Sequence, residues 1–196
     1  MAVKPLEILS RHYNAGSLAY YVVLTHSVLV AHKAREVASR YVKLHPGAEP
    51  DLQFLEEIAL LHDIGIKFVH APEIGCVGPD PYIRHGIRGR ELLEQEGLPR
   101  HALAGERHTG AGITVEEVNA QELPLPRRDY LPLSLEEKIL CIADKFYRKT
   151  SPNPWKEKSL AKVCRRLERF GPAVLSRWHD LWNEICGVEA SESLPR

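Results

Sequence analysis

Six histidine and aspartate side chains occupy positions where the helical pattern of the chain predicts an apolar core or a helix end. They are His26, His62, Asp63, His85, His108 and Asp144. His26 lies in the middle of an apolar helix face, and Asp144 ends an apolar stretch. A buried imidazole needs partners, and a buried carboxylate is costly unless it is paired or bound to a metal. Imidazole and carboxylate are both ligands of divalent transition metals, so these residues predict a metal centre.

The chemistry that such a centre performs is hydrolysis. In a site with two ions a carboxylate bridges the metals, and a water between them loses a proton near neutral pH and becomes a nucleophile. Neutral nitrogen ligands suit this task because they leave the ions acidic. We expect one or two divalent ions of iron, manganese, nickel, cobalt or zinc, with magnesium also compatible, because residue type does not choose among them.

Hydrophobic periodicity predicts that helices position these residues, because apolar residues recur at three- and four-residue steps. The expected helices span residues 17–44, 52–63, 81–95, 100–107, 115–119, 135–149, 155–170 and 172–186. Asp51, Thr114 and Ser134 are the expected N-caps, and Glu137 stands at the capping-box spacing from Ser134. Residues 66–81 predict an irregular loop of a length that is usually functional, and no strand is expected. The expected fold class is all-α, a helical bundle with the metal site in its core.

The order of these residues resembles the HD superfamily of metal-dependent phosphohydrolases. Residues 62–65 read His-Asp-Ile-Gly and reproduce the HDIG variant of the family letter for letter. The segment from His26 is similar to the first-histidine helix of the family, and Asp144 stands where the last ligand is expected. Residues 106–113, 129–132 and 135–139 resemble small prokaryotic HDIG proteins of unassigned substrate. The resemblance covers residues 20–149.

The resemblance implies a ligand set and a domain organisation. The first metal would be held by His26, His62, Asp63 and Asp144, and the second by His85, His108 and a bridging Asp63. Residues 1–150 would form the HD domain, residues 151–190 basic helices packed on the same domain, and residues 191–196 a flexible tail. The remaining six histidines match no position of the family pattern, although His70 lies in the loop next to the site.

The resemblance also implies a phosphate substrate, and such a substrate needs cations on its outer oxygens. Candidates lie within four residues of a proposed ligand: Lys67, Arg84, Arg88, Arg107 and Lys145. We assign catalytic roles to Asp63, Lys67 and Lys145, and substrate binding to Arg84, Arg88, Arg107 and Thr109. The predicted reaction is hydrolysis of a small phosphate ester, a nucleotide or another phosphomonoester, by metal-bound hydroxide.

One branch of the superfamily fits this chain poorly. Cyclic-dinucleotide phosphodiesterases of the family carry lysine directly after HDIG, whereas Ile66 follows Gly65 here and Lys67 comes one position later. After His108 the chain continues Thr-Gly-Ala-Gly, without a second histidine or a tyrosine-proline pair. Two other functions stay open: an HD-fold di-iron oxygenase, which uses a similar ligand set, and a non-catalytic nucleotide-binding module.

Charge and composition limit the partners. The 196 residues include 26 basic and 26 acidic ones, and a net charge of zero argues against a surface wholly committed to nucleic acid or anionic lipid. Residues 145–177 nevertheless hold ten Lys or Arg against two Glu, a net of +8, which leaves −8 for the rest. This segment is either a solvated helix face or a surface that attracts an anionic substrate or an RNA end.

The sequence also supports an expectation for the cellular compartment and for the oligomeric state. The first residues show no signal-peptide pattern, and no apolar run is long enough to span a bilayer. The four cysteines form no C-x-x-C pair and predict isolated buried thiols of a reducing cytoplasm. We expect a cytoplasmic protein with no membrane partner, and a symmetric homodimer by base rate.

Overall fold

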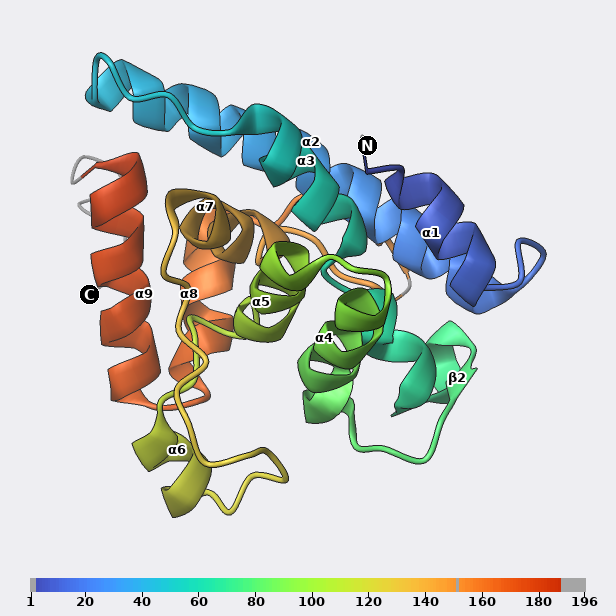
Figure 1. Cartoon of the computed structure of the whole chain (residues 1–196). Coiled ribbons are helices and arrows are strands. Elements are labelled where there is room, and N and C mark those ends of the chain that lie inside the picture. Colours follow the sequence, from blue (N-terminus) through green and yellow to red (C-terminus); the bar gives the residue numbers. More distant parts are fainter. Residues whose placement is uncertain (1–2, 151, 188–196) are drawn as a thin grey trace.

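The computed structural model describes residues 3–150 and 152–187, and helices dominate that part of the chain (Figure 1). Its α-helices are α1 Pro5–His12, α2 Leu18–Leu44, α3 Leu52–Leu61, α4 His85–Gln95, α5 Pro99–Arg107, α6 Val115–Ala120, α7 Leu135–Asp144, α8 Leu160–Glu168 and α9 Pro172–Cys186. The predicted all-α class is confirmed. None of these helices is both long and apolar enough to cross a membrane.

Side-chain caps begin the helices that carry the site. The Ser17 hydroxyl accepts a hydrogen bond from Tyr20 N–H at the start of α2, and Asp51 accepts one from Phe54 N–H at the start of α3. Ser134 caps α7 in the same way. The capping box expected there is half formed, because the Glu137 carboxylate accepts from Leu133 N–H rather than from the cap residue.

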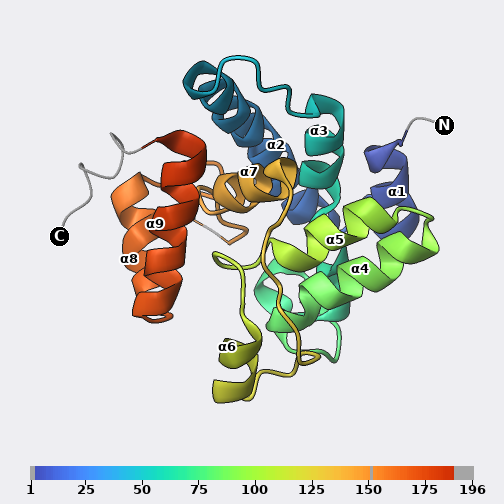
Figure 2. The same cartoon turned by 60° about the vertical axis from the view of Figure 1, so that its left-hand side comes forward.

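One hydrophobic cluster joins helices that are far apart in sequence. Val30 of α2, Ile58 of α3 and Ile142 of α7 pack in the same cluster as residues of the C-terminal pair, among them Leu167 of α8 and Trp178 of α9. Helices α8 and α9 lie side by side, and α9 contacts both α2 and α7 (Figures 1 and 2). Helices α4 and α5 form a second adjacent pair. This packing brings α2, α3, α5 and α7 around one centre.

Several expected helices are shorter in the structure. The helix expected over 81–95 begins as α4 only at His85, and the helix expected over 52–63 ends as α3 at Leu61. Helix α7 ends at Asp144 instead of continuing to residue 149, and the chain turns away there because the buried Lys158 ammonium donates to Lys145 O at 2.6 Å and Tyr147 O at 2.5 Å. The helix expected from residue 155 begins only at Leu160, where the Ser159 hydroxyl accepts from Lys162 N–H. Helix α1 was not predicted. The tail expected at 191–196 lies outside the described residues.

The segment expected to be an irregular loop contains short regular pieces. The 3-10 turn η1 Ile64–Phe68 precedes the strand β1 His70–Ala71, and η2 Pro72–Ile74 connects β1 to its partner β2 Cys76–Val77. A third turn, η3 Tyr82–Arg84, precedes α4. The strands are antiparallel, with His70 opposite Val77. The expectation of no strand is therefore wrong here, because runs of two residues carry no periodicity that a sequence pattern could show.

Candidate metal centre

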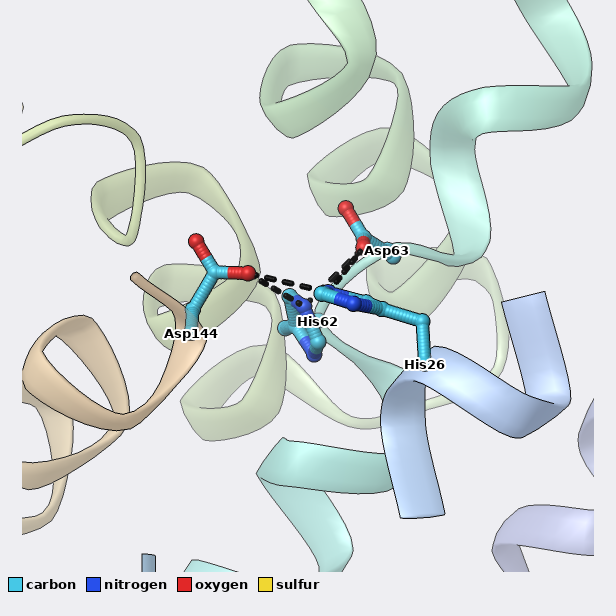
Figure 3. Close-up of side chains that lie close together, drawn as sticks. All are labelled: His26, His62, Asp63 and Asp144. Atoms are coloured by element: carbon cyan, nitrogen blue, oxygen red, sulfur yellow. Dashed lines mark hydrogen bonds and ion pairs between the residues drawn. The ribbon is translucent and has the colours of Figure 1, made fainter. Parts of the chain in front are cut away.

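Four predicted ligands from three separate segments point to one centre (Figure 3). His26 comes from α2, His62 and Asp63 follow directly on α3, and Asp144 is the last residue of α7. His26 Nε2 lies 2.9 Å from Asp144 Oδ1, and His62 Nε2 lies 3.6 Å from the same oxygen. One potential ligand atom from each of the four residues lies within 4.8 Å of the others. Such a spacing allows all four to bind a single ion.

Asp63 also belongs to a second group of ligands. His85 begins α4 and His108 follows α5, and both lie within 4.8 Å of Asp63 by their ligand atoms. Asp63 Oδ2 faces His26 at 3.3 Å and His62 at 3.0 Å. The other oxygen, Oδ1, faces His85 at 3.7 Å and His108 at 3.5 Å. One carboxylate therefore stands between two histidine pairs, as a bridging ligand does.

Three of the four histidines are fixed by the same hydrogen bond. His62 Nδ1 lies 2.8 Å from Ala59 O, and the Nδ1 atoms of His85 and His108 lie 2.7 Å from Tyr82 O and Gly105 O. A carbonyl oxygen only accepts, so each Nδ1 carries the proton. In the neutral form of each ring the lone pair is then on Nε2, the atom that faces the centre. Histidines that bind metals are oriented in this way.

Unpartnered atoms at the centre fit a cation. Asp63 Oδ1 and His62 Nε2 are buried and have no hydrogen-bond partner among the described residues, whereas Asp63 Oδ2 pairs with the Lys149 ammonium. The Nε2 atoms of His85 and His108 lie 3.1 Å apart with their lone pairs facing each other. Burial lowers the pKa of His85 to about 3 and also lowers the pKa of His108, so both rings are neutral. A metal ion would satisfy all of these atoms.

The carboxylates are ionised despite their burial. Burial raises the pKa of Asp63, but His62 and Lys149 outweigh it and hold this pKa well below its usual value. The pKa of Asp144 is low as well, because Lys145 and Lys149 outweigh its burial. For His62, burial lowers the pKa, and the two carboxylates overcome this and raise the pKa to about 9. The centre therefore offers two negative charges to a cation.

A cavity of about 490 Å³ opens onto the centre. His85, His108 and Asp144 form part of its wall, together with Thr109, Lys145 and Lys149. Tyr82, Glu117, Gln121 and Arg166 also line it. Apolar side chains form much of the rest of the wall: Ile83, Ile113, Leu123, Phe170 and Val174. A pocket with an apolar wall and a few convergent polar groups is the usual form of a small-molecule site.

Two cations at this cavity were missed in the sequence. Lys149 Nζ lies 2.7 Å from Asp63 Oδ2, and Arg166 lines the cavity. Both belong to the basic segment 145–177, where they counted only as net charge. Their positions depend on the turn after α7 and on the packing of α8, which no local pattern predicts.

Four predicted cations lie away from the cavity. The Lys67 ammonium donates to His12 O at 2.7 Å, and Arg107 pairs with Glu137 at 3.2 Å. Arg88 bonds to Asp80 and Glu91, and Arg84 lies 4.0 Å from Asp80. None of the four lines the cavity, which departs from the expected placement around the substrate. Lys145 and Thr109 do line it.

The other predicted histidines and the cysteines behave as ordinary residues. His70 is exposed on β1 and lies outside both ligand groups. His101 is buried, and its Nε2 pairs with Glu57 at 2.9 Å. All four cysteines are buried free thiols, as predicted from their spacing.

Comparison with known proteins gives a family and several relatives. The family described as HD domain matches residues 23–149. An uncharacterized protein of Methanocaldococcus jannaschii is 42% identical over 123 residues, which cover 62% of this chain and 64% of that protein. A Picrophilus torridus protein named tRNA (cytidine(56)-2'-O)-methyltransferase is 34% identical over 142 residues, which cover 68% of this chain and 36% of that protein.

A protein of Thermoplasma volcanium with the same methyltransferase name is 35% identical over 98 residues, which cover 50% of this chain and 25% of that protein. The chain thus spans less than two thirds of the length of each of these three relatives. No solved structure matches the chain significantly.

Proposed function

The chain belongs to the HD domain family, which implies the metal-dependent hydrolase superfamily, and from this premise we propose that it hydrolyses a small phosphate ester. The substrate would be a nucleotide or another phosphomonoester. The observation that carries the proposal is Asp63, whose two oxygens face two different histidine pairs at 3.0 to 3.7 Å. This arrangement suits two ions held side by side over a phosphate.

Each ion would have its own ligands and share one. We assign His26, His62, Asp63 and Asp144 to the first ion, and Asp63, His85 and His108 to the second. When bound, the ions supply Lewis acidity toward a water and toward the phosphoryl oxygens. The hydrogen bonds from Nδ1 to backbone carbonyls keep His62, His85 and His108 in the ligating tautomer without rearrangement.

Two lysines would stabilise the charge that develops on phosphorus oxygens. The Lys145 ammonium donates to His108 O at 3.0 Å and also bonds to Asp144, which holds it at the cavity wall. The Lys149 ammonium lies 2.7 Å from Asp63. Cations that are already in place stabilise such charge without reorganisation. The apolar wall of the cavity suits a leaving group such as a nucleoside.

The names of two relatives do not indicate the activity of this chain. They are named for methyl transfer to tRNA, but the matching part is 36% and 25% of their lengths. The matched region of this chain carries a cluster of histidine and aspartate, whose chemistry is metal binding. We therefore propose phosphoester hydrolysis for this region, with a nucleotide as the first substrate class to test.

The proposal is tested by metal analysis of the purified protein followed by a phosphatase screen over nucleotides and sugar phosphates. Asp63→Ala should lose the metal and the activity together. Asp80→Ala is the matched control, because Asp80 pairs with Arg88 outside the cavity and should leave both unchanged. Full activity in a metal-free Asp63→Ala protein would contradict the mechanism.

The same assays separate the two alternatives. Stoichiometric iron with substrate-dependent oxygen uptake would replace the phosphohydrolase by a di-iron oxygenase. Tight nucleotide binding without turnover, at full metal content, would replace it by a binding module. Manganese- or nickel-dependent release of phosphate supports the hydrolase.

A further inference from the structure

A basic groove adjoins the cavity over the metal centre. Its volume is about 550 Å³, and six of its eight lining residues are Lys or Arg, of which Lys158 is buried with its amine on the carbonyls of Lys145 and Tyr147. The six are Arg148, Lys158, Lys162, Arg165, Arg166 and Arg169. No acidic side chain lines the groove. We call these six residues and the space between them the basic groove.

The cations of the groove come from two segments that fold together. Lys162, Arg165, Arg166 and Arg169 recur at three- and four-residue steps, so they share one face of α8 and its C-cap. The other face, with Val163 and Leu167, is buried in the core. Arg148 and Lys158 reach the groove from the chain between α7 and α8.

This concentration of charge has no internal compensation. Within the part of the chain that the structure describes, five of these side chains form no ion pair and donate no hydrogen bond. They are Arg148, Lys162, Arg165, Arg166 and Arg169. Every arginine of α4 and α5, by contrast, pairs with an acidic side chain. Like charges three or four residues apart repel each other on a helix.

The helix dipole accounts for only part of this pattern. It favours cations in the last turn of α8. It does not favour Lys162 in the first turn, and it has no bearing on Arg148. A bound anion would relieve the repulsion between all of them.

The groove and the cavity share a boundary. Arg166 and Phe170 line both of them. The Phe170 side chain is 60% exposed at this boundary, where an aromatic face is available for a base to stack. A substrate with one phosphate at the metal centre would pass Phe170 before it reaches the cations of the groove.

We propose that the basic groove binds a second phosphate of the substrate, separated from the scissile phosphate by a nucleoside that lies against Phe170. This inference rests on the proposed function and narrows its substrate class. A nucleoside bisphosphate and the phosphorylated end of an oligonucleotide both have this chemistry. A nucleoside monophosphate lacks it.

The test variant is Arg165→Ala/Arg169→Ala. Both residues are exposed and line the groove only, whereas Arg166 also lines the cavity and is left in place. The matched control is Arg35→Ala/Lys43→Ala, which removes the same charge from exposed positions of α2 that line neither space. Circular dichroism checks that both variants remain folded.

The kinetic arm uses the metal-loaded protein with adenosine 5'-monophosphate, adenosine 3',5'-bisphosphate and a 5'-phosphorylated trinucleotide. For substrates with a second phosphate, the groove variant should raise KM about tenfold or more with kcat nearly unchanged, because charge-assisted hydrogen bonds are lost. KM for the monophosphate should not change. If KM rises for the bisphosphate, the groove binds the second phosphate of a mononucleotide as well as that of an oligonucleotide. If KM rises for the trinucleotide alone, the groove binds oligonucleotide ends only.

The binding arm does not depend on turnover. Fluorescence anisotropy measures the affinity of a fluorescein-labelled, 5'-phosphorylated trinucleotide for each variant over a series of salt concentrations. The groove variant should bind more weakly and with a smaller salt dependence than the wild type. Equal affinity in the groove variant and the wild type, or an equal loss in the control, overturns the inference. If the wild type hydrolyses none of these substrates but binds the trinucleotide, and the groove variant loses that binding, the proposed function is overturned and the groove remains supported.

Discussion

Gly65 packs directly on the backbone of Gly89, so closely that a Cβ on Gly65 would lie 2.2 Å from the Gly89 nitrogen. The same Cβ would lie 2.2 Å from the carbonyl oxygen of His85. The contact holds the turn after His62 and Asp63 against α4, the helix that begins with His85. The glycine of the His-Asp-Ile-Gly string is therefore needed for the close approach of two backbones, which sets Asp63 between the two histidine pairs.

The first prediction follows from the asymmetry of this contact. Gly65→Ala should destabilise the protein by about 1–3 kcal/mol, because backbone atoms must move apart. It should also lower the metal content. Gly89→Ala is the matched control: its Cβ would meet Gly65 N at 3.5 Å, an ordinary contact, and alanine favours a helix. Urea unfolding measures the stability of the two variants, and metal analysis measures their metal content. Equal effects of the two substitutions would refute this account.

The second prediction separates the two ions. His85→Ala should remove the second ion and retain the first, because His85 belongs only to the group with His108. Asp63→Ala should remove both. Mass spectrometry of metals per chain after dialysis decides this. Loss of all metal in His85→Ala would indicate a single shared site.

The third prediction concerns Lys149, which lies 2.7 Å from Asp63, and Lys67, which bonds to His12 O. Lys149→Met should reduce kcat about 100-fold, the usual cost of losing one preorganised charge-stabilising group. Metal content should persist. Lys67→Met should retain activity, since its ammonium does not line the cavity. The reverse result would restore the role that the sequence suggests for Lys67.

A fourth prediction uses the N-cap of α3. The backbone N–H of Phe54 and the Arg100 guanidinium lower the pKa of Asp51 below its usual value. Asp51→Ala should cost about 1 kcal/mol at pH 7. Because the folded pKa is lowered, the stabilisation by the charged form is present above pH 4 and is lost as the pH falls through the folded pKa.

Asp51→Asn is the control, since asparagine caps equally well but does not titrate. The difference in unfolding free energy between wild type and Asp51→Asn should therefore change between pH 7 and pH 3. A difference that stays constant over this range would contradict the assignment.

The fifth prediction concerns the thiols. Burial raises the pKa of Cys141 to about 11 and the pKa of Cys186 to about 11, and it raises the pKa of Cys76 and Cys164 as well. At pH 8 a disulfide reagent should titrate four thiols in the unfolded protein and react with the native protein only as fast as it opens. Rapid reaction of the native protein would show that a thiol is accessible.

Local features of the fold could be predicted from the sequence because they depend on residues that are neighbours in the chain. The caps Asp51, Thr114 and Ser134 and the apolar periodicity of α2 predicted where helices begin, and the structure agrees. The end of α7 could not be predicted from the sequence. It depends on the buried Lys158, fourteen residues beyond Asp144, which donates to Lys145 O and Tyr147 O just after α7. The short strands β1 and β2 were missed because two residues show no pattern.

The sequence by itself determined the helical class and the six residues that gather at the centre, since ligand type and helix position are local properties. Only the tertiary structure decided how they are shared: each oxygen of Asp63 faces a different histidine pair because α4 packs on the turn at Gly65. It also decided which cations face the cavity. Lys67 and Lys149 lie four and five residues after Asp63 and Asp144, but the direction of a side chain beyond a helix end depends on what the chain packs against.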